Sequence, residues 1–178
     1  MEKGTRSRPA YLRHRCNSQR EIDAALAAGF DGVEIDLVWR EKEPCLHHSH
    51  GGKGEFLSDV DFRNCIVAVN IKEYGMAKYL ALPTAREWFA FDVPGPEIDL
   101  YLIEKVRVFG RFSQFEDQCR VKAIAGTLVD DFTATKEGQG ALMIQARPPV
   151  ALISNQLRFA EDSAWVREAS SYIILKDK

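Results

Sequence analysis

Two carboxylates, Glu34 and Asp36, lie in one apolar stretch of the chain and are separated by a single residue. Residues 32–39 alternate in polarity with a period of two, which is typical of a β-strand. Side chains alternate between the two faces of a strand, so both carboxylates are expected on the same face. Because neighbouring carboxylates repel each other, we expect a cation or a strong local partner to hold them.

Mg²⁺ and Ca²⁺ prefer oxygen ligands of this kind. The amide of Asn70, in a strand predicted at residues 65–72, could supply a third and neutral oxygen. The alternative is a buried ionic network in which Arg15 and Lys72 neutralise the two carboxylates. We prefer the metal ion, because such a network contributes little stability when it is buried.

Imidazoles and cationic side chains occur on both sides of the acidic strand. His14 and Arg15 end the first predicted strand, and Lys72 ends the third. Three of the four histidines begin eleven residues beyond Asp36: His47, His48 and His50. Histidine can exchange protons near neutral pH, and Arg and Lys can hold phosphate oxygens. Cleavage of a phosphodiester requires these groups together, because it needs a base, an acid and positive charge at the phosphoryl oxygens.

The elements that must position these residues begin with a strand, a helix and a second strand. Ser18 and Glu21 have the Ser-x-x-Glu spacing of a capping box, which predicts a helix start. Gly29 is typical of the left-handed position that ends a helix. A short link then leads to the strand at residues 32–39, so we expect parallel pairing with a right-handed crossover.

The same alternation continues to the end of the chain. Strands are predicted at residues 9–15, 32–39, 65–72, 88–93, 106–109, 124–129, 150–154 and 172–175. Later helices are predicted at residues 75–86, 97–104, 115–120, 137–146 and 162–169. Eight strands with helical connections predict an α/β fold of the compact (β/α)8 TIM-barrel type. The fold usually takes about 250 residues, so a doubly wound open sheet is the alternative that fits the length better.

In a parallel barrel the functional residues lie at the carboxyl ends of the strands. Polar residues follow nearly every predicted strand, and the later strands add a further set: Asp92, Arg111, Asp130, Asp131 and Asn155. A random distribution would scatter polar residues over both ends of the strands. The pattern therefore predicts one site at one end of the barrel.

Composition limits the possible partners. The 178 residues are expected to form one domain, residues 1–178, with residues 1–8 as a loose lead-in. The formal net charge of −2 and the lack of a long basic run give no reason to expect a nucleic-acid partner. No apolar run approaches the ~20 residues that would span a membrane. The cysteines show no Cys-x-x-Cys pair, so free thiols and a cytoplasmic location are expected.

The order of these motifs resembles the glycerophosphodiester phosphodiesterase family, in the superfamily of phosphatidylinositol-specific phospholipase C. The matching motifs are His14-Arg15, Gly32-Val33-Glu34-Ile35-Asp36, Pro44-Cys45-Leu46-His47-His48 and Asn70-Ile71-Lys72. The resemblance implies a barrel that hydrolyses a small phosphodiester with a divalent cation, Mg²⁺ or Ca²⁺. The roles that it implies are a catalytic pair, His14 and His48; substrate-binding residues, Arg15, Lys72 and Arg111; and metal ligands, Glu34, Asp36 and Asn70.

The chain departs from the family pattern at three positions. Asn70 stands where the family commonly has Glu, which should weaken the metal site, Ser49 where it usually has Asp, and Cys16 where it usually has Gly. Strand alternation alone does not choose between His48 and His50, because Gly51-Gly52 makes the local backbone adaptable. Family spacing selects His48.

A rival hypothesis from another functional class is a non-catalytic barrel that binds a phosphorylated sugar or another anionic ligand. Asn70, Ser49 and the short loops favour this hypothesis. The intact His-Arg and Glu-x-Asp motifs oppose it. Hydrolysis that stops when divalent cations are removed would separate the two.

Overall fold

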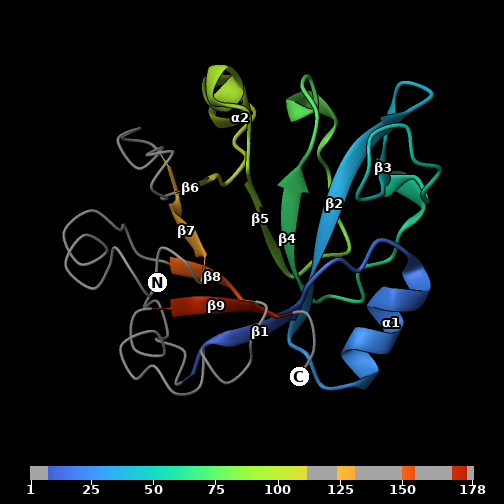
Figure 1. Cartoon of the computed structure of the whole chain (residues 1–178), viewed down its shortest axis with the longest axis vertical. Coiled ribbons are helices and arrows are strands. Elements are labelled where there is room, and N and C mark those ends of the chain that lie inside the picture. The colour runs from blue at the N-terminus through green and yellow to red at the C-terminus, as the bar shows by residue number, and fades with distance from the viewer. Residues whose placement is uncertain (1–7, 112–123, 131–149, 155–169, 176–178) are drawn as a thin grey trace.

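The computed structural model describes residues 8–111, 124–130, 150–154 and 170–175, which form an α/β fold (Figure 1). The strands are β1 (Ala10–Arg13), β2 (Gly32–Arg40), β3 (Glu43–Leu46), β4 (Ile66–Ile71), β5 (Glu87–Phe91), β6 (Phe109–Arg111), β7 (Gly126–Asp130), β8 (Val150–Ser154) and β9 (Ser170–Leu175). The helices in these ranges are α1 (Gln19–Ala27) and α2 (Ile98–Ile103), with 3₁₀ turns η1 (Leu57–Asp59), η2 (Ala77–Tyr79) and η3 (Gly95–Glu97).

Eight parallel strands form a nearly closed, barrel-like sheet. Their order is β5-β4-β2-β1-β9-β8-β7-β6, and every neighbouring pair in it is parallel. A parallel bridge between Ala90 and Val108 brings β5 to the start of β6. This order differs from that of a doubly wound open sheet. The predicted helices at 115–120, 137–146 and 162–169 lie outside the described residues, so the described part is a barrel-like sheet with two short α-helices.

Helix α1 begins and ends as its sequence predicts. The Ser18 hydroxyl accepts a hydrogen bond from the Glu21 N–H at 3.3 Å. Glu21 Oε2 in turn accepts from the Asn17 N–H at 2.8 Å and from the Ser18 hydroxyl at 2.9 Å. These bonds satisfy donors that the first turn of a helix leaves unpaired. Gly29 then adopts a φ of 81°, which suits a residue without a side chain.

Two predicted elements are wrong or shifted, and one observed strand was not predicted. Residues 75–86 form only the turn η2, because Pro83 has no N–H to donate and disfavours a helical backbone at Leu82. Strand β3 was not predicted; it pairs antiparallel with β2 through a tight turn. The turn residues Glu41 and Lys42 have φ of 52° and 72° without being glycine or asparagine. Strand β6 begins at Phe109, where the predicted strand ends.

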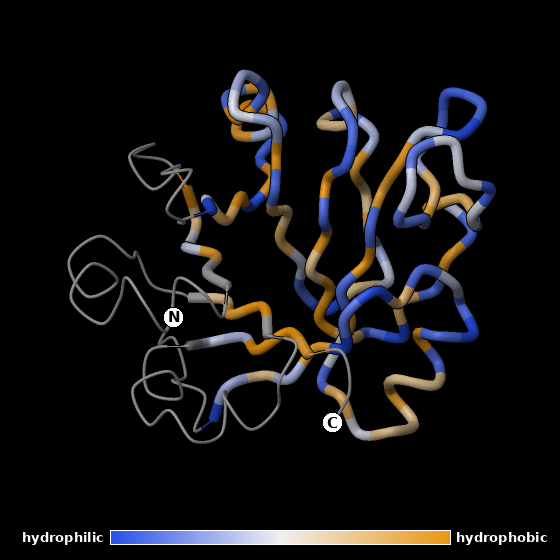
Figure 2. Tube along the Cα trace, in the orientation of Figure 1, coloured by the Kyte–Doolittle hydropathy of each residue, from blue (hydrophilic) through white to orange (hydrophobic). Residues whose placement is uncertain are grey.

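Alternating side chains divide the core into two layers. One layer includes Val33, Ile35 and Leu37 of β2, together with Ile22 and Ala25 of α1. The second is formed by the opposite faces of the strands: Ala10, Leu12, Ile66, Ala68, Phe89, Phe91, Phe109, Leu128, Ala151, Tyr172 and Ile174. In that layer the Phe89 and Phe109 rings stack with centroids 4.0 Å apart. Figure 2 shows these apolar strands and the more hydrophilic loops at the upper end of the sheet.

Candidate functional site

The inner face of the strands changes from apolar to polar toward their carboxyl ends. On β4, Ile66 and Ala68 belong to the inner apolar layer, and Asn70 follows them on the same face. Asn70 is also the register partner of Asp36 on the neighbouring strand β2. The period of two therefore places a polar layer, formed by Glu34, Asp36 and Asn70, directly next to the inner apolar core.

Glu34 is completely buried in this layer. Its Oε2 accepts a hydrogen bond from the Arg15 backbone N–H at 2.6 Å and lies 3.6 Å from His14 Nε2. Arg15 presents this N–H from a backbone with φ of 58°, while its side chain is exposed. Burial, together with the charge of Asp36, raises the pKa of Glu34 to about 8. Without additional positive charge, Glu34 therefore holds its proton well above the usual range of a carboxyl group.

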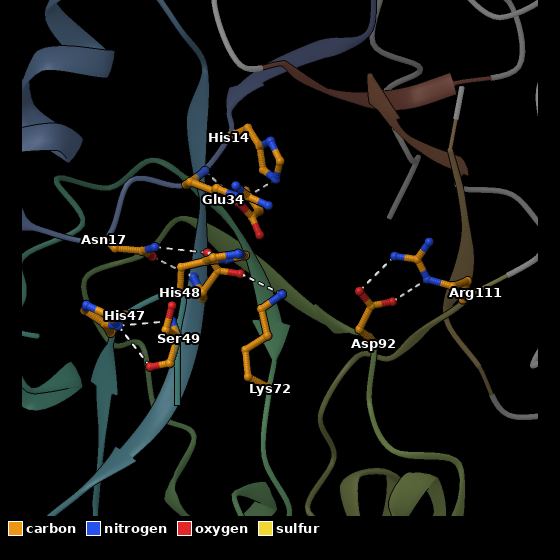
Figure 3. A network of polar contacts seen from close by, with 11 residues as sticks. His14, Asn17, Glu34, His47, His48, Ser49, Lys72, Asp92 and Arg111 are labelled. Carbon is orange, nitrogen blue, oxygen red and sulfur yellow. Dashed lines mark hydrogen bonds and ion pairs between the residues drawn. The ribbon is translucent and has the colours of Figure 1, made fainter. Parts of the chain in front are cut away.

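Asp36 is also completely buried, but it has several polar partners (Figure 3). Its Oδ2 accepts a hydrogen bond from Asn17 Nδ2 at 3.0 Å and lies 3.1 Å from His48 Nδ1. Its Oδ1 forms an ion pair with Lys72 Nζ at 3.1 Å. Burial alone would raise the pKa of Asp36, but the hydrogen bonds from Asn17 and Lys72 outweigh burial and lower it. The two carboxylates thus differ: Asp36 is kept ionised, and Glu34 is not.

His14 follows β1 and is largely buried beside Glu34. Burial, and next the charge of Arg15, lower the pKa of His14 to about 4. The imidazole is therefore neutral at physiological pH. A neutral imidazole can accept a proton, which is what a general base must do.

The three clustered histidines have different partners. His48 lies against Asp36, whereas His50 Nδ1 is 2.6 Å from Glu73 Oε1. His47 Nδ1 accepts a hydrogen bond from the Ser49 backbone N–H at 3.0 Å. The structure thus brings His48 to the carboxylates and directs His47 and His50 to other groups.

A second charged pair, Asp92 and Arg111, lies at the carboxyl ends of β5 and β6, away from the His48 and Lys72 side chains (Figure 3). Asp92 follows β5 and Arg111 ends β6. Arg111 Nε lies 2.5 Å from Asp92 Oδ1, and its terminal nitrogen lies 2.8 Å from Oδ2. This bidentate pair fixes the orientation of Arg111, which was predicted as a substrate-binding residue. Asp130 ends β7, while Asp131 and Asn155 lie outside the described residues.

Sequence reasoning missed Asn17. Its side-chain Oδ1 accepts a hydrogen bond from the Asp36 backbone N–H at 2.7 Å, and its Nδ2 donates to the carboxylate of the same residue. Asn17 immediately precedes the N-cap Ser18, so it reads as part of the helix start. The available signal was its position only two residues after the His14-Arg15 motif.

Three oxygens of the polar layer, Glu34 Oε1, Asp36 Oδ1 and Asn70 Oδ1, are of the type that binds a hard divalent cation. Among the described residues, Glu34 Oε1 and Asn70 Oδ1 are buried without a hydrogen-bond partner, whereas Asp36 Oδ1 is paired with Lys72 Nζ at 3.1 Å. Buried oxygens without donors are costly unless a cation compensates them. Across the residues that the structure describes, however, no three His, Cys, Asp or Glu side chains form a group that could hold a metal ion. A cation here would rely on the Asn70 amide and would compete with Lys72.

The thiols and the helices add two observations. Cys16, Cys45 and Cys65 are free and buried, as expected, and Cys119 lies outside the described residues. None of the helices in the described ranges is both long and apolar enough to cross a membrane.

No protein-family model matches the chain, and a search of the curated proteins finds no match.

Proposed function

We propose that this chain is a cation-dependent phosphodiesterase of the glycerophosphodiester type, built on a (β/α)8 TIM barrel. The observation that supports the proposal best is the buried polar layer around Glu34 and Asp36. It combines the neutral imidazole of His14, the His48 imidazole beside Asp36, the Lys72 ammonium, and two buried oxygens without a hydrogen-bond partner among the described residues, all at one end of a parallel sheet.

His14 and His48 are suited to the two proton transfers. In the proposed reaction a hydroxyl of the substrate attacks phosphorus, the bond to the leaving oxygen breaks, and a cyclic phosphodiester forms. Neutral His14 takes the proton of the attacking hydroxyl. His48, whose ring is oriented by Asp36 at 3.1 Å, gives a proton to the leaving oxygen. Water then opens the cyclic phosphodiester to a phosphomonoester: His48 takes a proton from the water and His14 returns its proton to the ring oxygen, so both imidazoles regain their starting states.

Positive charge must offset the charge of the phosphoryl oxygens. Lys72 lies 3.1 Å from Asp36, and the exposed Arg15 side chain begins beside Glu34, so both are near the proposed phosphate position. Glu34, Asp36 and Asn70 would hold Mg²⁺ or Ca²⁺. When bound, the cation would stabilise negative charge on the phosphoryl oxygens and keep Glu34 ionised.

A panel of small phosphodiesters, assayed with Mg²⁺, Ca²⁺ or Mn²⁺ and with a chelator, tests the proposal. We expect hydrolysis that stops on chelation, and a kcat at least ~10²-fold lower in His14→Ala and His48→Ala. His47→Ala and His50→Ala are the matched controls, since the His47 ring contacts the Ser49 backbone and the His50 ring contacts Glu73 instead of Glu34 or Asp36. Near-normal turnover in all four variants would contradict the assignment.

The cation has its own test. Calorimetric titration of Mg²⁺ and Ca²⁺ should show binding to the native protein that Asp36→Ala loses. If neither cation binds the native protein, the metal site is wrong. Because Asn70 is neutral, the affinity should be weaker than at a site with three carboxylates.

One observation favours the rival function, a non-catalytic barrel that binds a phosphorylated sugar or another anionic ligand. The Lys72–Asp36 ion pair already neutralises one carboxylate within the protein. Binding of a phosphorylated sugar without any hydrolysis, and without any need for a cation, would support this rival.

A further inference from the structure

A cavity lies at the end of the sheet opposite the polar layer. It has a volume of about 320 Å³ and is lined by residues at the start of β5 and residues just before β6. Asp92 and Arg111 lie at the other ends of the same two strands. The cavity is therefore separate from the proposed active site.

Cationic side chains dominate the lining. Arg86, Lys105 and Arg107 contribute three positive charges, and Glu87 contributes one negative charge. Glu87 lies 3.8 Å from Arg107, a loose ion pair at the surface. Within the part of the chain that the structure describes, the side chains of Arg86 and Lys105 make no hydrogen bond or ion pair. The described lining of the cavity thus has an excess of two positive charges, and the charged groups of Arg86 and Lys105 are available to bind a ligand.

Backbone hydrogen bonds fix the main chain at the three cationic residues, which lie just before β5 and in the link between α2 and β6. The Arg86 N–H donates to the Cys65 carbonyl at 2.8 Å, and the Arg107 carbonyl accepts from the Ala90 N–H at 2.8 Å. Lys105 directly follows the C-cap of α2, and its N–H donates to the Leu102 carbonyl at 3.0 Å. The three exposed side chains therefore start from fixed backbone positions around the cavity.

We infer that this cavity binds a small dianion of the phosphate-monoester class. Its volume of about 320 Å³ is at the low end for small-molecule pockets and suits a small ligand. Arginine binds phosphate oxygens bidentately and lysine adds a point charge. Trp88 and Leu82 supply an apolar wall for the group that the phosphate is attached to.

Calorimetric titration of phenyl phosphate into the full chain tests this site. We expect binding whose affinity falls at least about tenfold in Arg86→Gln and in Lys105→Gln. Arg20→Gln on α1 is the matched control, because it removes the same charge from an exposed side chain outside the cavity. Its affinity should stay within about twofold of native.

A resonance at the cavity locates the ligand. The indole N–H of Trp88, which lines the cavity, should shift on titration with phenyl phosphate. The inference is overturned if phenyl phosphate does not bind at about 10 mM. It is also overturned if Arg20→Gln weakens binding as much as Arg86→Gln does, or if phenyl phosphate binds without shifting the Trp88 indole resonance. None of these outcomes depends on hydrolysis, so the proposed function stands or fails separately.

Discussion

Replacing Asn17 by alanine should destabilise the protein more than its position beside a helix start suggests. The substitution removes the hydrogen bonds at 2.7 Å and 3.0 Å that Asn17 makes with Asp36. Because Asp36 is completely buried, water cannot readily replace either bond. An unsatisfied buried N–H costs about 1–3 kcal/mol, and a bond to a charged group contributes about 1.5–3 kcal/mol. These effects overlap, so we expect the free energy of unfolding to fall by about 2–4 kcal/mol.

Urea unfolding followed by circular dichroism measures this loss, with Gln19→Ala as the matched control. The Gln19 amide also makes two backbone hydrogen bonds, both to Asp61 at 2.9 Å, but at a partly exposed position. Water can replace these bonds, so Gln19→Ala should cost only about 0.5–1.5 kcal/mol. Faster hydrogen exchange at the Asp36 amide should accompany Asn17→Ala alone. Equal losses in the two variants, or less than about 0.5 kcal/mol in Asn17→Ala, would refute the reasoning.

Two further predictions concern the histidine loop and the buried thiols. In Gly52→Ala the new Cβ would overlap the His47 ring, so we expect the free energy of unfolding to fall by about 1–3 kcal/mol, measured by thermal melts. Gly95→Ala is the control: its Cβ meets open space, so its stability should change little. Burial raises the pKa of Cys16 to about 12 and of Cys65 to about 11, so both stay protonated in the folded state at pH values where unfolded thiols ionise. Stability should therefore be intact below pH ~8.5 and should fall as pH rises above it, by up to about 1.4 kcal/mol per pH unit for each thiol. Urea unfolding between about pH 8 and 9.5 measures the slope, and Cys16→Ala should reduce it; an unchanged slope would contradict the assignment.

The sequence is most informative where one physical pattern decides the structure. Alternation along β2 and the apolar run of β4 predict the two strands, and the period of two places Glu34, Asp36 and Asn70 on one face. The Ser18–Glu21 capping box predicts the start of α1 for a similarly local reason. Proximity of Glu34, Asp36 and Asn70 then follows from parallel pairing alone.

Other features depend on contacts that no local pattern contains. The helix predicted over residues 75–86 has suitable apolar spacing, but Pro83 limits it to one turn. Strand β3 forms because β2 continues beyond the barrel and offers it an edge. Contact of His48, and not His50, with Asp36 depends on the path of that hairpin. Leu46 ends β3, and the next residues turn toward Asp36.

The partners of Asp36 have a consequence for the order of folding. Asn17 is 19 residues from Asp36, and His48 is 12 residues from it. Closing the sheet instead requires β1 to pair with β9, at opposite ends of the described chain. Joining β1 to β9 costs about 2 kcal/mol more chain entropy than forming the short loops around Asp36. The polar layer is therefore expected to gain its contacts early in folding, before β9 closes the sheet.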